Sequence, residues 1–203
     1  RFFVEGDPEA ILMLEVASDE ADKTEAFARK LIEDLISNNF GYAYPILEGK
    51  NIEKANTLRK AGLGLLGNIV GDRKAVACIE DTAVEVSDLP AYISEFTAMM
   101  KAYGQEAVYY AHAGAGELHL RPILNLKREE DIHLFREITT KVAQLVKKYK
   151  GSMSGEHGDG IVRSSFLPYM IGQKNYELLI RIKQTFDPQS IFNQGKIIDA
   201  YPM

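Results

Sequence analysis

The sequence predicts an α+β protein in which helices cover one face of an antiparallel sheet. Strand-like and helical patterns alternate along its 203 residues without a Pro-rich or Ser-rich linker, which favours one domain made of two similar α+β halves. The strand-like runs carry charged or polar side chains at alternate positions, among them Glu15, Glu80 and His119. A parallel sheet covered on both faces would need nearly uninterrupted apolar strands, so a doubly wound sheet is the weaker alternative.

Three pairs of strand and helix are expected in the first half, about residues 1–104. The expected strands are the short apolar or β-rich runs Ile11–Ala17, Tyr44–Glu48 and Ala75–Val86. The expected helices are a stretch with helical apolar spacing from Ala26 to Ile36, the segment Asn51–Gly62 with Asn51 as its N-cap, and a helix opened by Asp88-Leu89-Pro90.

The second half, about residues 105–203, begins with a strand-like stretch that glycines interrupt. Its expected elements are this stretch over Ala107–Leu124, a long amphipathic helix over Arg128–Lys150, a Gly- and Ser-rich loop over Gly151–Gly160 and a last helix over Tyr176–Phe186. The predicted organisation is therefore a single domain over residues 1–203.

Composition excludes several classes of function. The 24 Lys and Arg are scattered among 29 Asp and Glu, with a net charge of −5, so a surface that binds nucleic acid is not expected. No apolar run approaches the roughly 20 residues of a membrane-spanning helix. Cys78 is the only cysteine, which leaves no internal disulfide or thiolate zinc cluster and makes the cytoplasm the expected compartment. Because Arg1 is not an initiator Met, we expect a piece of a longer polypeptide.

The segment Gly62–Gly67 satisfies the dinucleotide fingerprint GxGxxG, with Asp81 near the expected acidic position. That fingerprint binds a pyrophosphate only where a strand ends and a helix begins, because the phosphate sits at the helix N-terminus. Here a helical pattern precedes the glycines, and Asn68–Lys74 is too short for a crossover helix. We interpret the segment as a flexible turn, not as a dinucleotide site.

Two of the four histidines, His112 and His119, flank a glycine-rich turn. In a fully extended chain they would lie roughly 23 Å apart, whereas two imidazoles that share a metal ion each lie about 2.0–2.1 Å from it. A two-residue hairpin loop at Ala115-Gly116 would pair residue 112 with residue 119 and place both rings on one face. The spacing predicts a joint site; the alternative is that both rings only form hydrogen bonds within a strand pair.

A second glycine-rich segment, Ser154–Gly160, carries Glu156 and His157 next to each other. Two His and one Glu form a divalent-metal site with open positions for substrate oxygens, so Glu156 is the expected third ligand. An imidazole changes its charge near neutral pH, and His157 is the expected general base. The alternative is that this segment is only a turn.

Two arginines are candidates for binding the anionic groups of a substrate. Arg121 lies two residues beyond His119, and therefore on the same face of the expected strand. Arg59 belongs to a helix whose other charged residues are expected in solvent, so spacing alone favours a surface role for it.

Three ordered motifs resemble the C-terminal domain of FAD-linked oxidases, a family that includes D-lactate dehydrogenase, the FAD subunit of glycolate oxidase and D-2-hydroxyglutarate dehydrogenase. They are His112–Pro122, Gly155–Gly160 and Phe186–Lys196, and the resemblance covers nearly the whole chain. The Gly-Ala-Gly turn and the segment His119-Leu-Arg-Pro are most similar to large bacterial members that carry an FAD domain and an iron–sulfur domain.

The resemblance implies a duplicated, ferredoxin-like α+β domain that closes over FAD held by a separate N-terminal domain. By motif, it implies metal ligands at His112, His119 and Glu156, a base at His157, a substrate-carboxylate arginine at Arg59 and a residue near the flavin at Asn193. The implied cofactors are FAD in the full-length protein, a divalent metal such as zinc, manganese or iron, and an iron–sulfur cluster in a separate domain. Because the glycine-rich fingerprint is rejected and the resemblance places most flavin contacts in the N-terminal domain, this chain by itself is expected to bind no FAD.

The activity that the resemblance implies is oxidation of a D-2-hydroxyacid, of the lactate, glycolate or 2-hydroxyglutarate class, by hydride transfer to FAD. The isolated fragment is expected to be inactive, and its electron acceptor, which is not identified, could associate the protein with a membrane. Three departures from the family pattern bear on metal affinity and substrate: Ala115 in place of an acidic residue, Arg121 where 2-hydroxyglutarate enzymes often have Asn, and Gln194 in place of Pro. The alternatives are a metal-dependent hydrolase that needs no flavin, and a non-catalytic α+β interaction module.

Overall fold

The computed structural model describes residues 2–203, except for the side chain of Leu63. The chain forms two compact units, Arg1–Leu63 and Gly64–Met203, and each is described by itself. The interpretation as one domain with halves near residues 1–104 and 105–203 stays a prediction.

The first unit contains helix α1 (Ala21–Ser37) and most of helix α2 (Lys50–Leu66), so both predicted helices are confirmed. Asn51 lies inside the first turn of α2 and is not its N-cap. The predicted strands Ile11–Ala17 and Tyr44–Glu48 are wrong, because neither segment is a strand in the structure. An apolar run becomes a strand only where another strand accepts its backbone hydrogen bonds, and the described sheet pairs neither of them.

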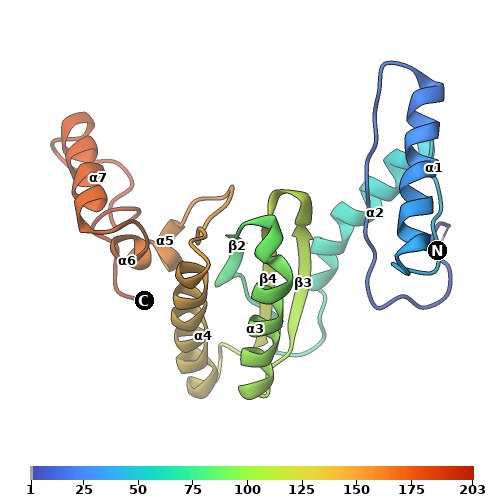
Figure 1. The fold of residues 1–203 in the computed structure, drawn as a ribbon. Helices are drawn as coiled ribbons and strands as arrows, with labels where there is room; N and C mark the ends of the chain where they lie inside the picture. The colour runs from blue at the N-terminus through green and yellow to red at the C-terminus, as the bar shows by residue number, and fades with distance from the viewer. Residues whose placement is uncertain (1) are drawn as a thin grey trace. The chain divides into compact units, whose positions relative to one another are not determined.

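The second unit is built on one antiparallel sheet (Figure 1). Its strands are β1 (Lys74–Ala75), β2 (Ile79–Ala83), β3 (Ala107–His112) and β4 (Glu117–Leu124). Strand β4 is central, because β3 pairs with one of its edges while β1 and β2 pair with the other. The predicted strand 75–86 is therefore two shorter strands, and the α+β class with an antiparallel sheet is confirmed.

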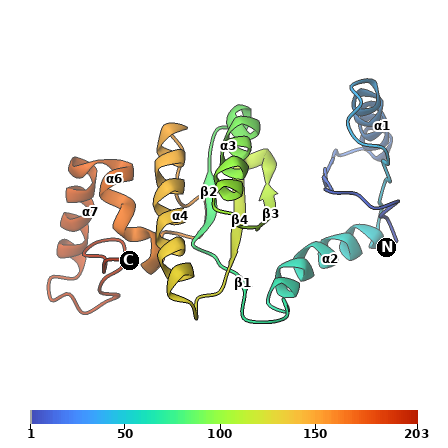
Figure 2. The same ribbon diagram turned by 90° about the horizontal axis from the view of Figure 1, so that it is seen from below.

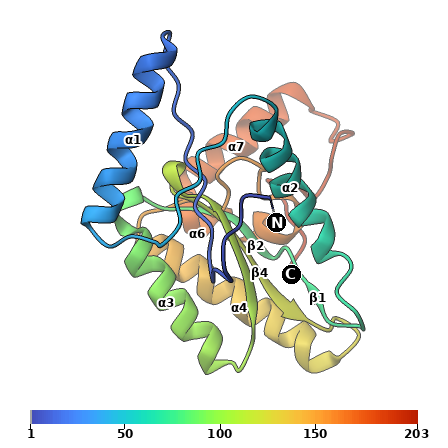
Figure 3. The ribbon, with the colours of Figure 1, turned by 90° about the vertical axis from the view of Figure 1, so that its right-hand side faces the viewer.

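Helices α3 (Leu89–Ala102) and α4 (Glu129–Lys148) lie side by side over one face of this sheet (Figures 2 and 3). The short 3-10 helix η1 (Val86–Asp88) leads into α3, whose first turn holds Pro90 as predicted. Fully buried apolar side chains from both layers form the core: Ile79, Tyr92, Phe96, Leu120, Ile138, Val142 and Val146. This packing fixes the sheet, and with it the face that carries the predicted site.

Beyond α4, the described chain is helical and looped. The elements there are α5 (Gly160–Arg163), the 3-10 helix η3 (Ser164–Phe166), α6 (Leu167–Ile171) and α7 (Gln173–Phe186). The predicted last helix corresponds to α7, but α5 and α6 are too short to produce a periodic pattern. Apart from a single bridge between Ala83 and Ser152, the described residues after Leu124 add nothing to the sheet, so the ferredoxin-like duplication is not confirmed.

The GxGxxG segment lies at the end of a helix and not at its start. Gly62 and Gly64 belong to α2, which ends at Leu66. This position matches the rejection of the dinucleotide fingerprint, which requires the glycines at a helix N-terminus. Within residues 2–203, no helix is both long and apolar enough to cross a membrane.

Candidate metal and substrate site

The hairpin of β3 and β4 has a longer loop than the sequence predicts. His112 lies opposite Glu117, and Tyr110 lies opposite His119, so the predicted pairing of residue 112 with residue 119 is wrong by two residues. The connection consists of the 3-10 helix η2 (Ala113–Ala115) followed by Gly116, which has a φ of 72°. A Cβ atom on Gly116 would lie 2.0 Å from the carbonyl oxygen of Val84, so this turn requires glycine.

The register shift keeps both histidines on one face and adds a carboxylate between them. Side chains alternate along a strand, so a shift by two residues leaves the face of each residue unchanged. The His112 and His119 rings lie 5.3 Å apart between centroids, and the His119 ring stacks on Tyr110 at 4.3 Å. Glu117 Oε1 lies 3.6 Å from His119 Nε2. Sequence reasoning missed Glu117, although its position two residues before His119 already placed both residues on the same face.

The second predicted loop brings a fourth ligand group to this face. Glu156 Oε1 lies 3.9 Å from His112 Nε2 and 3.9 Å from His119 Nε2. Ligand atoms from His112, Glu117, His119 and Glu156 all lie within 4.8 Å of one another. The structure therefore brings the three predicted metal ligands together, and Glu117 with them.

His157 lies beside this group. Its Nε2 atom is 3.1 Å from Glu156 Oε1, and its ring centroid is 5.6 Å from that of His119. About half of the His157 side chain is exposed, whereas His119 is buried. His157 thus has the solvent access that a proton acceptor for a substrate needs.

Three buried atoms of this group lack a hydrogen-bond partner within the part of the chain that the structure describes. Glu117 Oε1 and both ring nitrogens of His119 have no hydrogen-bond partner. Buried polar groups are normally paired, and each unpaired one costs free energy. Two ligands of one tetrahedral zinc ion lie about 3.4 Å apart, close to the separations of the nitrogen and oxygen atoms here. Neutral imidazoles and carboxylates are suitable ligands, so these residues fit a divalent cation.

Burial shifts the pKa values of two residues in this group, Glu117 and His119. Burial, together with the nearby Asp81 and Glu156 carboxylates, raises the pKa of Glu117 to about 7. Burial also lowers the pKa of His119 and so favours the neutral ring that a metal requires. A bound divalent cation would favour the ionised form of Glu117.

Arg121 and His119 are two residues apart on β4, so their side chains lie on the same face of the strand, as their spacing predicts. One Arg121 nitrogen, Nη2, lies 2.5 Å from Glu80 Oε2, and the other Glu80 oxygen lies 3.5 Å from His119 Nδ1. The Nε atom of Arg121 is buried without a hydrogen-bond partner among the described residues. The Glu80 carboxylate therefore lies between the Arg121 guanidinium and the His119 ring, and its negative charge offsets part of the arginine charge.

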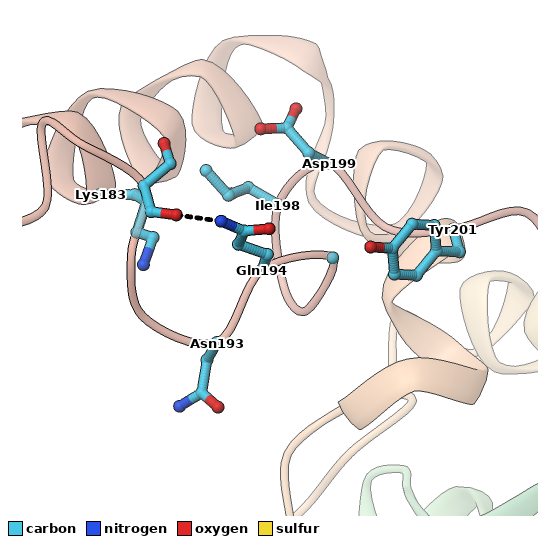
Figure 4. A pocket seen from close by; sticks show the side chains of 8 residues that line it. Lys183, Asn193, Gln194, Ile198, Asp199 and Tyr201 are labelled. Carbon is cyan, nitrogen blue, oxygen red and sulfur yellow. Dashed lines mark hydrogen bonds between the residues drawn. The ribbon is translucent and has the colours of Figure 1, made fainter.

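The two remaining predicted residues lie outside this group. Arg59 is exposed on α2, in the first unit, and its role as a substrate-binding residue stays a prediction. Asn193 lies in the loop after α7, has a φ of 43° and lines a pocket with Lys183, Gln194 and Tyr201 (Figure 4). Its amide points away from Tyr201, and its predicted contact with the flavin stays untested.

Comparison with known proteins identifies relatives over nearly the whole chain. The family model "FAD linked oxidases, C-terminal domain" matches residues 3–197. The D-2-hydroxyglutarate dehydrogenase of Pseudomonas putida is 36% identical over 200 residues, which are 94% of this chain and 20% of that protein. The enzyme of the same name from Haemophilus influenzae is 40% identical over 147 residues, 72% of this chain and 14% of that protein.

A D-lactate dehydrogenase is also among the relatives. The protein of that name from Archaeoglobus fulgidus is 33% identical over 128 residues, which are 63% of this chain and 28% of that protein. The chain thus spans about a fifth of the Pseudomonas putida relative and little more than a quarter of the Archaeoglobus fulgidus relative.

Proposed function

The chain belongs to the family of the C-terminal domains of FAD-linked oxidases, and we propose that it is the substrate- and metal-binding domain of a flavin-dependent D-2-hydroxyacid dehydrogenase. The observation that carries this proposal is the convergence of His112, Glu117, His119 and Glu156. Within this group, Glu117 Oε1 and both ring nitrogens of His119 are buried without a hydrogen-bond partner among the described residues. The names of the relatives point to 2-hydroxyacids as substrates.

In this proposal, His112, His119 and Glu156 hold a divalent cation, and Glu117 contributes a further carboxylate. A set of imidazoles and carboxylates is compatible with zinc, manganese or iron. When bound, such an ion polarises a coordinated substrate oxygen and positions the substrate. His119 is buried and its ring stacks on Tyr110, so the surrounding side chains hold this proposed ligand in place.

His157 is the proposed acceptor of the substrate hydroxyl proton. Its Nε2 atom faces the Glu156 carboxylate at 3.1 Å, a contact that orients the ring. A side chain placed in this way contributes by taking the proton as the C–H bond breaks. Arg121 and Arg59 are the proposed partners of the substrate carboxylate, because guanidinium groups bind carboxylates through two parallel hydrogen bonds.

The flavin belongs to a separate N-terminal domain of the same polypeptide in this proposal. FAD bound there would supply the acceptor for the hydride that leaves the α carbon of the substrate. Asn193 is the proposed contact from this chain to the flavin, and an iron–sulfur cluster in another domain is the proposed route for electrons to the acceptor. The proposed compartment is the cytoplasm, which fits a lone, free cysteine at position 78.

The test uses the full-length protein with its flavin. D-2-hydroxyglutarate, D-lactate and glycolate are each mixed anaerobically with the protein while the flavin absorbance is followed. The proposal predicts that at least one of them bleaches the flavin. A protein whose flavin is reduced by none of the three, but which hydrolyses an ester in the presence of zinc, would support the metal-dependent hydrolase instead.

A further inference from the structure

The loop that carries Glu156 and His157 is held between two buried charged side chains. Asp81 on β2 is fully buried, and Arg163 at the end of α5 is 7% exposed. The two groups approach each other, with Arg163 Nη2 3.6 Å from Asp81 Oδ2. Charged groups are buried only where hydrogen bonds and counter-charges compensate them. The groups that form hydrogen bonds with Asp81 and Arg163 therefore indicate the role of this pair.

Asp81 binds the amide side of the loop. Its carboxylate accepts hydrogen bonds from Ser154 Oγ at 2.5 Å and from the backbone N–H groups of Gly155, Glu156 and His157 at 3.0, 2.8 and 2.9 Å. Three successive N–H groups therefore converge on one carboxylate, and the Gly155 N–H also donates to the backbone carbonyl oxygen of Asp81. These bonds fix the backbone at the two residues whose side chains face the predicted metal.

Arg163 binds the carbonyl side of the same loop. Its guanidinium donates to Met153 O at 2.8 Å and to Gly158 O at 2.7 Å, which are the two ends of the loop. It also donates to the carbonyl oxygen of Glu80, the residue before Asp81. One planar donor group thus ties both ends of the loop to strand β2.

The backbone of Asp81 has an uncommon conformation that aims its side chain at the loop. Its φ is 74°, and the pairing of β2 with β4 shifts register between Glu80 and Thr82. Such bulges redirect a side chain out of the regular alternation of a strand. Gly155 completes the fit, because a Cβ atom there would lie 3.2 Å from Asp81 Oδ1 and 3.2 Å from Glu117 Cγ.

We propose that Asp81 and Arg163 are positioning residues, a clamp that sets residues 153–158 so that Glu156 reaches His112 and His119. The inference rests on the proposed metal site, but neither Asp81 nor Arg163 belongs to the ligand set. Its consequence is that metal affinity depends on the number of acceptor atoms at position 81. Residues that orient metal ligands in this way typically contribute about 10- to 100-fold to metal affinity.

An Asp81→Asn substitution tests whether Asp81 acts as a hydrogen-bond acceptor for the loop or only fills space beside it. Asn has the same shape, but its amide NH₂ replaces one of the two acceptor oxygens. The hydroxyl of Ser154 can turn and accept from that NH₂, whereas the backbone N–H of His157 then faces another donor. The substitution therefore loosens the loop without creating a cavity.

The experiment measures Mn²⁺ affinity of the full-length protein by calorimetric titration, and amide hydrogen exchange of residues 153–158 without metal. Asp81→Asn is expected to weaken Mn²⁺ binding about tenfold or more and to speed exchange at residues 155–157. The matched control is Asp72→Asn, which removes a surface ion pair with Lys127 and is expected to change neither measurement. If Asp81→Asn does not fold, Ser154→Ala removes one bond to the same carboxylate, and a smaller loss of affinity is expected.

Two results would overturn the clamp. One is an unprotected loop in the parent protein, and the other is a folded Asp81→Asn protein that binds Mn²⁺ as tightly as the parent. Failure of the proposed function is distinguishable from both, because it appears as a parent protein that binds no Mn²⁺ while its loop amides stay protected. In that case faster exchange in Asp81→Asn still supports the clamp, and unchanged exchange rejects it.

Discussion

The two halves of the candidate metal site are positioned by different means. His112, Glu117 and His119 stand on a hairpin, where backbone hydrogen bonds between β3 and β4 fix which residues face the site. Glu156 stands on a loop outside the sheet, where the side chains of Asp81 and other residues hold the backbone. The geometry of the hairpin half should therefore depend mainly on its turn, whereas the geometry of the loop half should depend mainly on side chains such as Asp81.

The largest effect is expected from a substitution of His157 in the loop half, which should impair proton transfer but not metal binding. Replacing His157 with Asn in the full-length protein keeps a side chain of similar shape but removes the proton acceptor. Flavin reduction by the best 2-hydroxyacid should slow by about 10²–10⁴-fold, while Mn²⁺ affinity stays near that of the parent. Stopped-flow absorbance and titration calorimetry measure the two quantities.

A His157→Asn protein that reduces its flavin at nearly the parental rate would remove His157 from the mechanism. A protein that loses both rate and metal would make His157 part of the ligand set, which the 3.1 Å contact with Glu156 also permits.

A change in the turn tests the hairpin half. Gly116→Ala introduces a Cβ atom at a φ of 72°, 2.0 Å from the Val84 carbonyl oxygen, and should destabilise the hairpin by roughly 2–4 kcal/mol. Gly114→Ala is the matched control in the same turn, because nothing lies within 4 Å of a Cβ atom there. Amide hydrogen exchange across β3 and β4 measures the difference as a local opening free energy.

Equal protection in the Gly116→Ala and Gly114→Ala proteins would contradict the importance of the turn. It would mean that the connection between the strands can rearrange without loss of the pairing that places His112 opposite Glu117.

A smaller effect is expected at Glu117, the ligand that belongs to the hairpin but not to the predicted set. Glu117→Gln should weaken Mn²⁺ binding about tenfold and flatten its pH dependence. The folded pKa of Glu117, raised to about 7, means that the metal must displace a proton below that pH, so affinity in the parent rises with pH through 7.

Without metal, Glu117→Gln should not weaken the protein but should raise its free energy of unfolding at high pH. Because the folded pKa of Glu117 lies above the value of about 4.3 expected in the unfolded chain, its ionisation lowers stability as pH rises between these two values. The metal-free Glu117→Gln protein should therefore be more stable than the parent at pH 8 and similar to it at pH 4. A parent whose Mn²⁺ affinity does not change between pH 6 and pH 8 would contradict this account of Glu117.

The hairpin half was the more predictable of the two from sequence. Alternation along a strand placed His112 and His119 on one face even though the loop length, and hence the register, was wrong. Glu117 was missed although it lies on this face in both registers; a two-residue loop would pair it with Gly114, and the observed loop pairs it with His112. Loop length depends on the close approach of Gly116 to Val84, which no local pattern reveals.

The loop half shows where sequence reasoning ends. Its proposed ligand, Glu156, was predictable from a carboxylate in a glycine-rich segment. The role of Asp81 was not, because it depends on a bulge in a distant strand. The same limit explains the strand expected at Ile11–Ala17, where the run is apolar but pairs with no strand of the described sheet. In each case the missing information is a partner far away in the sequence.

The most direct test of the metal site is anomalous X-ray scattering from crystals of the full-length protein soaked in zinc. We expect one strong peak at the zinc edge, about 2.0–2.2 Å from His112 Nε2, His119 Nε2 and a Glu156 oxygen, with Glu117 as a further neighbour. Soaked crystals with no peak between these side chains, or with zinc bound while both histidines stay unligated, would contradict it.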